Sequence, residues 1–152
     1  MSPNTDPLGQ GYNIIQSTIA VGSGYIWGRG LGRGTQSRLQ FLPEYRTDFI
    51  FAAIAEELGF LGSTLIIAIY LFIVIYCFRV AGSAPDFFGA LIASGVAGMI
   101  LIQAAINIGM NIGLLPVTGI TLPLLSYGGS SLLATLISLG LVSSVAKSRH
   151  ER

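Results

Sequence analysis

The residue with the clearest chemical potential is Asp48, a carboxylate at the junction between an arginine-rich segment and a long apolar one. A carboxylate at such a junction, facing an arginine-lined cavity, could accept a proton from a hydroxyl as a general base. The structural alternative is that Thr47 caps a helix and Asp48 lies in its first turn, complementing the helix dipole. From the residues alone, the structural interpretation is favoured.

Two further carboxylates, Glu56 and Glu57, follow Asp48 along the same segment. On a continuous helix, Glu56 would lie about two turns, or ~12 Å, from Asp48. The paired carboxylates of glycosidases lie roughly 5–9.5 Å apart, so this spacing does not predict a hydrolase pair. Glu57 is interpreted as part of a solvated cap on the apolar segment, whereas Glu56 could be solvated or could need a partner inside the protein.

Three amide side chains, Gln103, Asn107 and Asn111, recur every four residues and therefore share one helical face. Such a stripe usually forms hydrogen bonds between helices and less often lines a polar cavity. A stripe of small residues lies near the opposite face: Ala90, Ser94 and Gly98. Small residues in this pattern predict a close contact with another helix.

The elements that carry these residues have the composition of a membrane protein. Hydrophobic residues make up 52% of the 152 residues and charged residues only 10%, against about 25% in a soluble domain. No charged residue occurs between Asp86 and Lys147, and residues 58–78 form a second uncharged run. One crossing takes ~20 helical residues, so the longer run holds two crossings and a connection marked by Pro116 and Pro123.

We therefore predict three transmembrane helices, at 49–78, 88–111 and 124–146. The connection between the second and third, residues 112–123, is expected to be re-entrant, since irregular backbone at membrane depth must be buried or line water. Gly128 and Gly129 are too flexible to start an isolated helix. The remaining segments are a loop with a short helix at 1–48, a second loop at 79–87 and a tail at 147–152.

The first segment combines an amphipathic helix with a glycine- and arginine-rich loop. Tyr12, Ile15 and Ile19 fall at helical spacing, which predicts a helix at 11–22. This helix would lie on the membrane surface or be buried against the rest of the protein. The loop that follows Trp27 carries four arginines: Arg29, Arg33, Arg38 and Arg46.

Charge and cysteine content exclude several classes of function. The net charge of +1 argues against a basic nucleic-acid-binding protein. The single Cys77 excludes an intramolecular disulfide framework and a cysteine-based zinc site. Four Lys or Arg residues would lie on each side of the membrane, so the charge rule does not set the orientation. We find no Ser/His/Asp set in motif spacing and no metal-ligand cluster, and His150 lies in the charged tail.

Two blocks of sequence resemble the SEDS family of shape, elongation, division and sporulation proteins, the RodA/FtsW/SpoVE group. The second half carries the run of residues that looks like the family signature: Asn107, Pro116, Gly119, Ser126, Tyr127, Gly128, Gly129, Ser130 and Ser131. The first half carries similar blocks at 34–36, 41–44, 47–51 and 56–59. The opening residues 6–16 resemble the RodA branch more than the FtsW branch, and the resemblance covers nearly the whole chain.

The resemblance implies an all-α polytopic membrane fold of about ten spans, of which this chain looks like the C-terminal part. We therefore expect three transmembrane helices and a large extracytoplasmic loop, and an incomplete piece that is inactive alone. In the bacterial inner membrane, 1–48 and 112–123 would lie outside the cytoplasm. Segments 79–87 and 147–152 would then be cytoplasmic.

The resemblance also implies the activity, a peptidoglycan glycosyltransferase that polymerises lipid II for cell elongation, rod shape or division. Asp48 would be the catalytic general base on the acceptor hydroxyl, and undecaprenyl diphosphate would leave. The implied substrate-binding residues are Arg33, Arg38, Arg46, Gln36 and Glu44. A divalent cation could assist at the diphosphate, although no ligand set in the sequence demands one.

The partners implied by the resemblance are lipid II, membrane lipids and a class B penicillin-binding protein, a transpeptidase, and not a nucleic acid. The transpeptidase would pack near the first two spans, with the small-residue stripe as a contact surface. Two other classes of function stay open. Broken helices and polar amides at membrane depth also suit a lipid II flippase or transporter, and a non-catalytic scaffold could simply position the transpeptidase.

Overall fold

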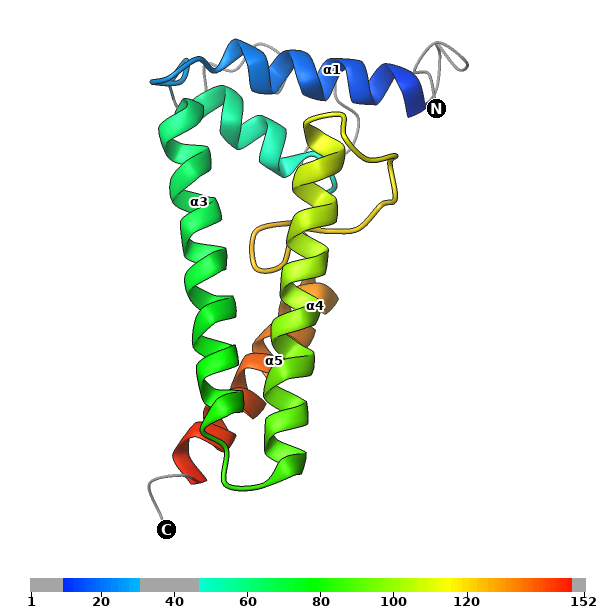
Figure 1. The fold of residues 1–152 in the computed structure, drawn as a ribbon. Helices are drawn as coiled ribbons and strands as arrows, with labels where there is room; N and C mark the ends of the chain where they lie inside the picture. The colour runs from blue at the N-terminus through cyan, green and yellow to red at the C-terminus, as the bar shows by residue number, and fades with distance from the viewer. Residues whose placement is uncertain (1–9, 31–46, 149–152) are drawn as a thin grey trace.

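The computed structural model describes residues 10–30 and 47–148, and its regular elements in those ranges are all α-helices. These are α1 (Gln10–Ser23), α3 (Ile50–Gly82), α4 (Phe87–Asn111) and α5 (Gly129–Ser148). The last three are long and apolar enough to cross a membrane. In Figure 1, α1 lies across one end of the long helices. The predicted all-α class with three membrane-spanning helices is confirmed for the described part of the chain.

Helix α3 consists of two parts that meet at Gly59, where φ is 68° and ψ is −163°. The first part, 50–58, rises toward α1 in Figure 1, and the chain then turns and descends as 60–82. At 1.5 Å per residue the descending part is about 35 Å long, enough for the ~30 Å hydrocarbon core. The helix expected at 49–78 is thus interrupted at Gly59 and extends to Gly82. Val80, near its end, still packs in the core.

The loop before α3 occupies the break. In an unbroken helix the N–H groups of Phe60 and Leu61 would donate to carbonyls four residues earlier. Here Phe60 donates to the carbonyl of Tyr25 at 2.8 Å and Leu61 donates to that of Ile26 at 3.3 Å. The loop therefore supplies the acceptors that α3 lacks at Gly59.

The carbonyls left behind by the break are also paired with this loop. Arg29 N–H donates to the Glu56 carbonyl and Gly30 N–H donates to the Glu57 carbonyl, both at 3.0 Å. These four backbone groups at the break thus have partners in the loop, as backbone away from water requires. The break is a joint of fixed geometry between the loop and the two parts of α3.

Three glycines make this joint possible. A Cβ at Gly59 would lie 2.3 Å from the nitrogen of Gly28, and the positive φ of Gly59 also disfavours a side chain. A Cβ at Gly28 would lie 2.1 Å from the carbonyl oxygen of Glu57, and one at Gly24 would lie 1.9 Å from that of Ala55. The loop backbone and the α3 backbone approach each other so closely that side chains are excluded at these positions on both segments.

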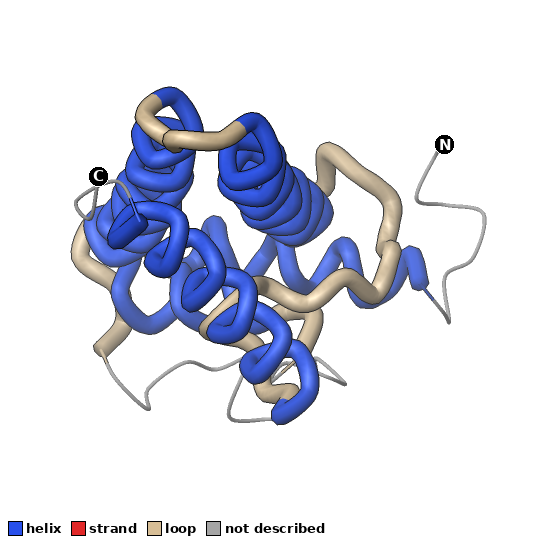
Figure 2. Tube along the Cα trace, turned by 90° about the horizontal axis from the view of Figure 1, so that it is seen from below, coloured by secondary structure: helices blue, strands red, loops and turns tan. Residues whose placement is uncertain are grey.

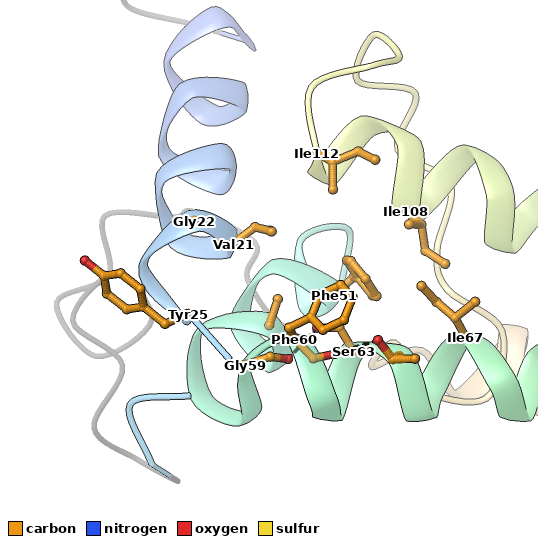
Figure 3. Close-up of a pocket in the computed structure, with 12 residues that line it drawn as sticks. Val21, Gly22, Tyr25, Phe51, Gly59, Phe60, Ser63, Ile67, Ile108 and Ile112 are labelled. Carbon is orange, nitrogen blue, oxygen red and sulfur yellow. Dashed lines mark hydrogen bonds between the residues drawn. The ribbon is translucent and has the colours of Figure 1, made fainter. Parts of the chain in front are cut away.

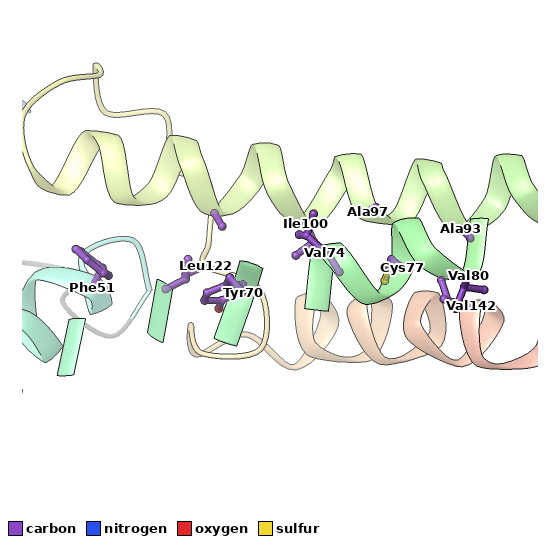
Figure 4. Packing of buried hydrophobic residues seen from close by; sticks show 11 residues of the cluster. Phe51, Tyr70, Val74, Cys77, Val80, Ala93, Ala97, Ile100, Leu122 and Val142 are labelled. Carbon is purple, nitrogen blue, oxygen red and sulfur yellow. The ribbon is translucent and has the colours of Figure 1, made fainter. Parts of the chain in front are cut away.

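The main core lies between α3 and α4, with α5 crossing this pair obliquely in the end-on view of Figure 2. Ala93 and Ala97 of α4 are fully buried and let the helix approach Val74 and Cys77 of α3 (Figure 4). The α4 stripe in this contact consists of Ala93, Ala97, Ile100 and Ala104, whereas Gly89 faces Val145 of α5.

The predicted small-residue stripe does not make this contact. Ala90, Ser94 and Gly98 are each only half-buried, and a Cβ at Gly98 would meet no atom within 4 Å. The helix is rotated by one residue, about 100°, relative to the prediction. The reason is that the adjacent stripe is also small and combines with Ile100, which fills the space between α3 and α4.

Helix α1 spans Gln10–Ser23, one residue more at each end than the expected 11–22. It packs against α3 through a face of small residues that includes the fully buried Ser17 and Ala20. The predicted apolar stripe of Tyr12, Ile15 and Ile19 is exposed instead. The helix thus contacts the described part of the chain with its small face and leaves its apolar stripe available to other surfaces.

The third span begins at Gly129, five residues after the expected position. Leu124 has φ of 67°, a left-handed conformation that no α-helix contains, so the helix cannot include it. Contrary to the prediction from the glycine pair, the helix does start there. The Gly128 carbonyl accepts bonds from Leu132 N–H and from the Ser131 hydroxyl, both at 3.0 Å. Local hydrogen bonds therefore override the weak helix propensity of glycine.

Candidate active site

Asp48 lies in the turn that leads into α3. Residues 47–49 form this turn, and the helix begins at Ile50 with Phe49 at the N-cap position, without a side-chain cap. The expected cap at Thr47 is therefore wrong, and Asp48 precedes the first turn. Phe49 is 2% exposed and packs with Ala20 and Ala52, so apolar packing fixes where the helix starts.

Two asparagines from α4 hold the backbone on either side of this start. Nδ2 of Asn107 and Nδ2 of Asn111 donate to the main-chain carbonyl of Asp48, at 3.0 and 3.1 Å. Oδ1 of Asn111 accepts a hydrogen bond from Ala52 N–H at 3.2 Å. Ala52 is the third residue of α3, and its N–H is one of the groups that a helix start leaves without a partner. Asn111 therefore caps α3 from another helix.

The second hydrogen of each amide is also used. Nδ2 of Asn107 donates to the Ile120 carbonyl at 2.7 Å, and Nδ2 of Asn111 donates to the Asn107 carbonyl at 2.8 Å. Both asparagine side chains are completely buried. Because every amide hydrogen is bonded in an interior of low dielectric, the pair fixes the turn at Asp48 in one position.

The connection between α4 and α5, residues 112–128, folds back into the protein beside this turn. The Ser126 hydroxyl donates to the Thr47 carbonyl at 2.6 Å and accepts from Leu122 N–H at 2.7 Å. The Tyr70 hydroxyl donates to the carbonyl of Pro123. Tyr70 lies ten residues, about 15 Å, beyond the break in α3. The connection therefore reaches well down the bundle, and the Ser126 hydroxyl and the Pro123 carbonyl bond it to the protein there.

The carboxylate of Asp48 faces this connection at Gly119. A Cβ on Gly119 would lie 3.7 Å from Oδ2 of Asp48, and Gly119 has a φ of 67° that favours glycine. The Asp48 side chain is half-buried. A Cβ at 3.7 Å would be in ordinary van der Waals contact with Oδ2, so the Asp48 carboxylate lies directly beside the connection at Gly119.

Glu56 is completely buried and lies at the other end of the 50–58 segment, next to the joint. Its backbone carbonyl bonds Arg29 N–H in that joint. Glu57 is half-buried beside it. The two glutamates therefore belong to the structure around the break, and Asp48 belongs to the structure around the asparagines.

The other predicted site residues divide into three groups. Asn107, Gly119 and Ser126 of the signature surround the turn at Asp48, and Gln103 is half-buried one helical turn away. The remaining signature residues lie at the surface or start α5: Pro116, Tyr127, Gly128, Gly129 and Ser130. The substrate-binding candidates lie outside the described residues: Arg33, Arg38, Arg46, Gln36 and Glu44.

Sequence reasoning missed two parts of the site. It placed Asn111 on the amide stripe but did not predict that it caps α3. It also did not predict the joint between Gly59 and the loop at 24–30, for which the dense glycines of the loop were the available signal. Within 10–30 and 47–148, no three His, Cys, Asp or Glu side chains gather in a group that could hold a metal.

An apolar groove of about 330 Å³ lies beside the joint, between α1, α3 and α4 (Figure 3). Phe51, Ile67 and Ile108 are among the residues that line it. The hydroxyls of Ser63 and Thr64 donate to carbonyls one turn earlier, at 2.9 and 2.8 Å. Because these hydroxyls bond their own helix, the groove surface is suited to hydrocarbon.

The chain matches the family model of FtsW/RodA/SpoVE cell cycle proteins over residues 1–151. It is 50% identical over 147 residues to stage V sporulation protein E of Bacillus subtilis, covering 97% of this chain and 40% of that protein. It is 47% identical over 145 residues to peptidoglycan glycosyltransferase MrdB of Escherichia coli, covering 95% of this chain and 39% of that protein. The chain thus spans about two fifths of the length of these relatives.

A solved structure titled as the structural coordination of polymerization and crosslinking by a peptidoglycan synthase complex has the same arrangement. It aligns with a TM-score of 0.77 and 41% identity, covering 99% of this chain and 40% of that one.

Proposed function

The chain belongs to the FtsW/RodA/SpoVE family of cell cycle proteins, and from this premise we propose that it carries the catalytic aspartate of a membrane-embedded peptidoglycan glycosyltransferase. The observation that carries the proposal is the geometry at Asp48. Two buried amides fix its backbone, and its carboxylate points toward Gly119 in the connection between α4 and α5. Relatives named peptidoglycan glycosyltransferase, at 47% identity, support the choice of reaction.

In the proposed reaction, Asp48 acts as general base on the acceptor sugar of lipid II. As the carboxylate takes the proton of the acceptor hydroxyl, the hydroxyl oxygen bonds the anomeric carbon of the growing glycan. The bond from that carbon to the diphosphate oxygen breaks, and its electron pair leaves with undecaprenyl diphosphate. No change of oxidation state is involved, and the proton is later lost from Asp48 to solvent.

The asparagine pair would contribute by orientation. A misplacement of ~1 Å at a reacting group can cost about 10²-fold in rate, and a carboxylate in a loose turn would move by at least that much. Asn107 and Asn111 restrict this motion by holding the Asp48 carbonyl from a rigid helix. They are positioning residues, since their amides bond protein rather than substrate.

The charges and the groove suit a lipid-linked substrate. Arg33, Arg38 and Arg46 would hold the diphosphates, because the guanidinium group matches phosphate oxygens geometrically, with Gln36 and Glu44 nearby. The apolar groove beside the joint is compatible with the hydrocarbon of such a substrate. The α1 end of the bundle would be extracytoplasmic, and the C-terminus would face the cytoplasm of a bacterial inner membrane.

A class B penicillin-binding protein is the proposed partner. The related complex that couples polymerization with crosslinking supports this choice. The small-residue stripe at Ala90, Ser94 and Gly98 is open to another helix, because a Cβ at Gly98 would meet nothing within 4 Å. A transmembrane helix of the partner could approach α4 closely along it.

A chimaera tests the proposal. This chain would replace the matched 145-residue segment of E. coli MrdB, and the chimaera would be purified with its transpeptidase and given lipid II. We expect glycan strands from the parent chimaera and none from Asp48→Asn. Asp86→Asn is the matched control, since Asp86 is an exposed carboxylate at the opposite end of the bundle, and it should polymerise normally.

The broken α3 and the re-entrant connection give the transporter alternative a structural basis, since transporters use such elements. The same proteins distinguish the alternatives. A flippase would move labelled lipid II across liposome membranes, and Asp48→Asn would preserve that movement. A scaffold would bind the transpeptidase without polymerising lipid II. Equal polymerisation by the parent and by Asp48→Asn would refute the general-base assignment.

A further inference from the structure

The tip of the loop in the α3 joint carries three large exposed side chains in a row. Tyr25, Ile26 and Trp27 are 80%, 59% and 81% exposed. Their backbone is nevertheless fixed, because the carbonyls of Tyr25 and Ile26 accept the N–H groups of Phe60 and Leu61. The tip therefore occupies a defined height relative to the descending part of α3.

The distance along α3 from the tip to the next charged residue matches the thickness of a bilayer core. Phe60 is the first residue after the break, and Arg79 is the exposed charge near the other end of the same helix. Nineteen residues separate them, about 28 Å at 1.5 Å per residue, against ~30 Å for the hydrocarbon core. If Arg79 marks one membrane–water interface, the tip lies at the other.

The chemistry of the tip fits this interface. Trp and Tyr are the residues enriched where hydrocarbon meets the headgroups, since each combines an apolar ring with a polar group. Tyr25 also has φ of 47°, a backbone conformation that non-glycine residues rarely adopt. The hydrogen bond from Phe60 N–H to the Tyr25 carbonyl holds this conformation, while the Tyr25 ring is left 80% exposed.

We propose that the 25–27 tip is an interfacial anchor, which inserts into the boundary between headgroups and acyl chains of one leaflet. The anchor sets the depth of the joint, because the tip and α3 share backbone hydrogen bonds there. The same loop holds the carbonyls of Glu56 and Glu57 at the end of the 50–58 segment. The segment that begins next to Asp48 is thereby attached to the membrane surface at a fixed level.

The depth of Trp27 can be measured directly, because it is the only tryptophan in the chain. The 152-residue chain would be reconstituted in phosphatidylcholine liposomes with nitroxide labels at the headgroup, at acyl carbon 5 or at acyl carbon 16. Iodide in the buffer would probe exposure to water. We expect the headgroup and carbon-5 labels to quench Trp27 at least threefold more than the carbon-16 label or iodide.

A relocated probe calibrates the measurement. In W27F/F72W the tryptophan moves to position 72. This exposed position lies on the descending helix, twelve residues after Phe60. There the carbon-16 label should quench most strongly. Quenching of Trp27 mainly by iodide would overturn the proposal, as would preference for the carbon-16 label. Equal resistance to lipid labels and iodide would show that protein covers the tip, and this would also overturn it.

Discussion

Replacing Asn111 by alanine tests whether a helix cap supplied from α4 positions the turn that carries Asp48. The substitution removes the acceptor of Ala52 N–H and one of two donors to the Asp48 carbonyl. The carbonyl keeps Asn107, but the N–H is on a residue with no exposure and has no water to replace its partner. An unsatisfied buried group costs about 1–3 kcal/mol, so we expect a destabilisation of about 2 kcal/mol.

The effect on activity should exceed what this destabilisation explains. With the cap lost, the turn at Asp48 can move by ~1 Å, which corresponds to about a 10²-fold lower rate. Polymerisation of lipid II by the chimaera would be measured at a temperature where Asn111→Ala remains folded. Gln103→Ala is the matched control, because Gln103 lies on the same amide stripe, one turn away, and is only half-buried.

The contrast between the two variants decides the interpretation. A loss confined to stability, with normal turnover by the folded fraction, would show that the asparagine cap is structural only. Equal losses of activity in Asn111→Ala and Gln103→Ala would show that the whole amide stripe, and not the cap alone, supports polymerisation. Normal stability together with normal turnover would refute the argument that Asn111 holds the turn.

Two further substitutions test the surrounding structure. Gly59→Ala should destabilise the fold by about 3 kcal/mol or more, as measured by thermal unfolding. The left-handed conformation costs alanine ~1–2 kcal/mol, and the clash of the new Cβ with the Gly28 nitrogen, 2.3 Å away, adds to this cost. Gly98→Ala is the control, since a Cβ there meets nothing within 4 Å, and it should leave the unfolding temperature unchanged or raise it. Equal losses of stability in Gly59→Ala and Gly98→Ala would contradict the close backbone contact at Gly59. Tyr70→Phe removes the hydrogen bond to the Pro123 carbonyl and should cost about 1 kcal/mol, whereas an unchanged unfolding temperature would mean that the re-entrant connection is held by other contacts.

The helices could be predicted because their evidence is local. Runs of uncharged residues mark the three spans, and Arg79, Asp86 and Lys147 mark ends where side chains meet water. The break in α3 could not be located in the same way, because residues 58–78 form one uninterrupted apolar run and Gly59 is an ordinary residue of such a helix. The break exists because a distant loop supplies four hydrogen bonds there.

The site shows the same division. The spacing of Asn107 and Asn111 predicted polar contacts of α4, and the structure adds that their partners are backbone groups at the start of α3. The cap at Thr47 was predicted from local preference. The actual cap is 59 residues further along the chain from Ala52, and no local pattern carries that information. The role of Asp48 itself rests on the family resemblance.

The loop at 24–30 supplies hydrogen bonds at the break in α3, and the asparagines of α4 supply them at its start. The order in which these two partners are synthesised has a consequence for biogenesis. The loop at 24–30 precedes α3 in the chain, so the partners for the break are already synthesised when Gly59 emerges from the ribosome. The asparagines that cap its start are synthesised about 60 residues after it. During membrane insertion the joint can therefore close while the turn at Asp48 still lacks its cap. The turn at Asp48 can therefore gain its hydrogen bonds only after α4 is synthesised, and an insertion intermediate without α4 would carry the aspartate but not the asparagines that hold its backbone.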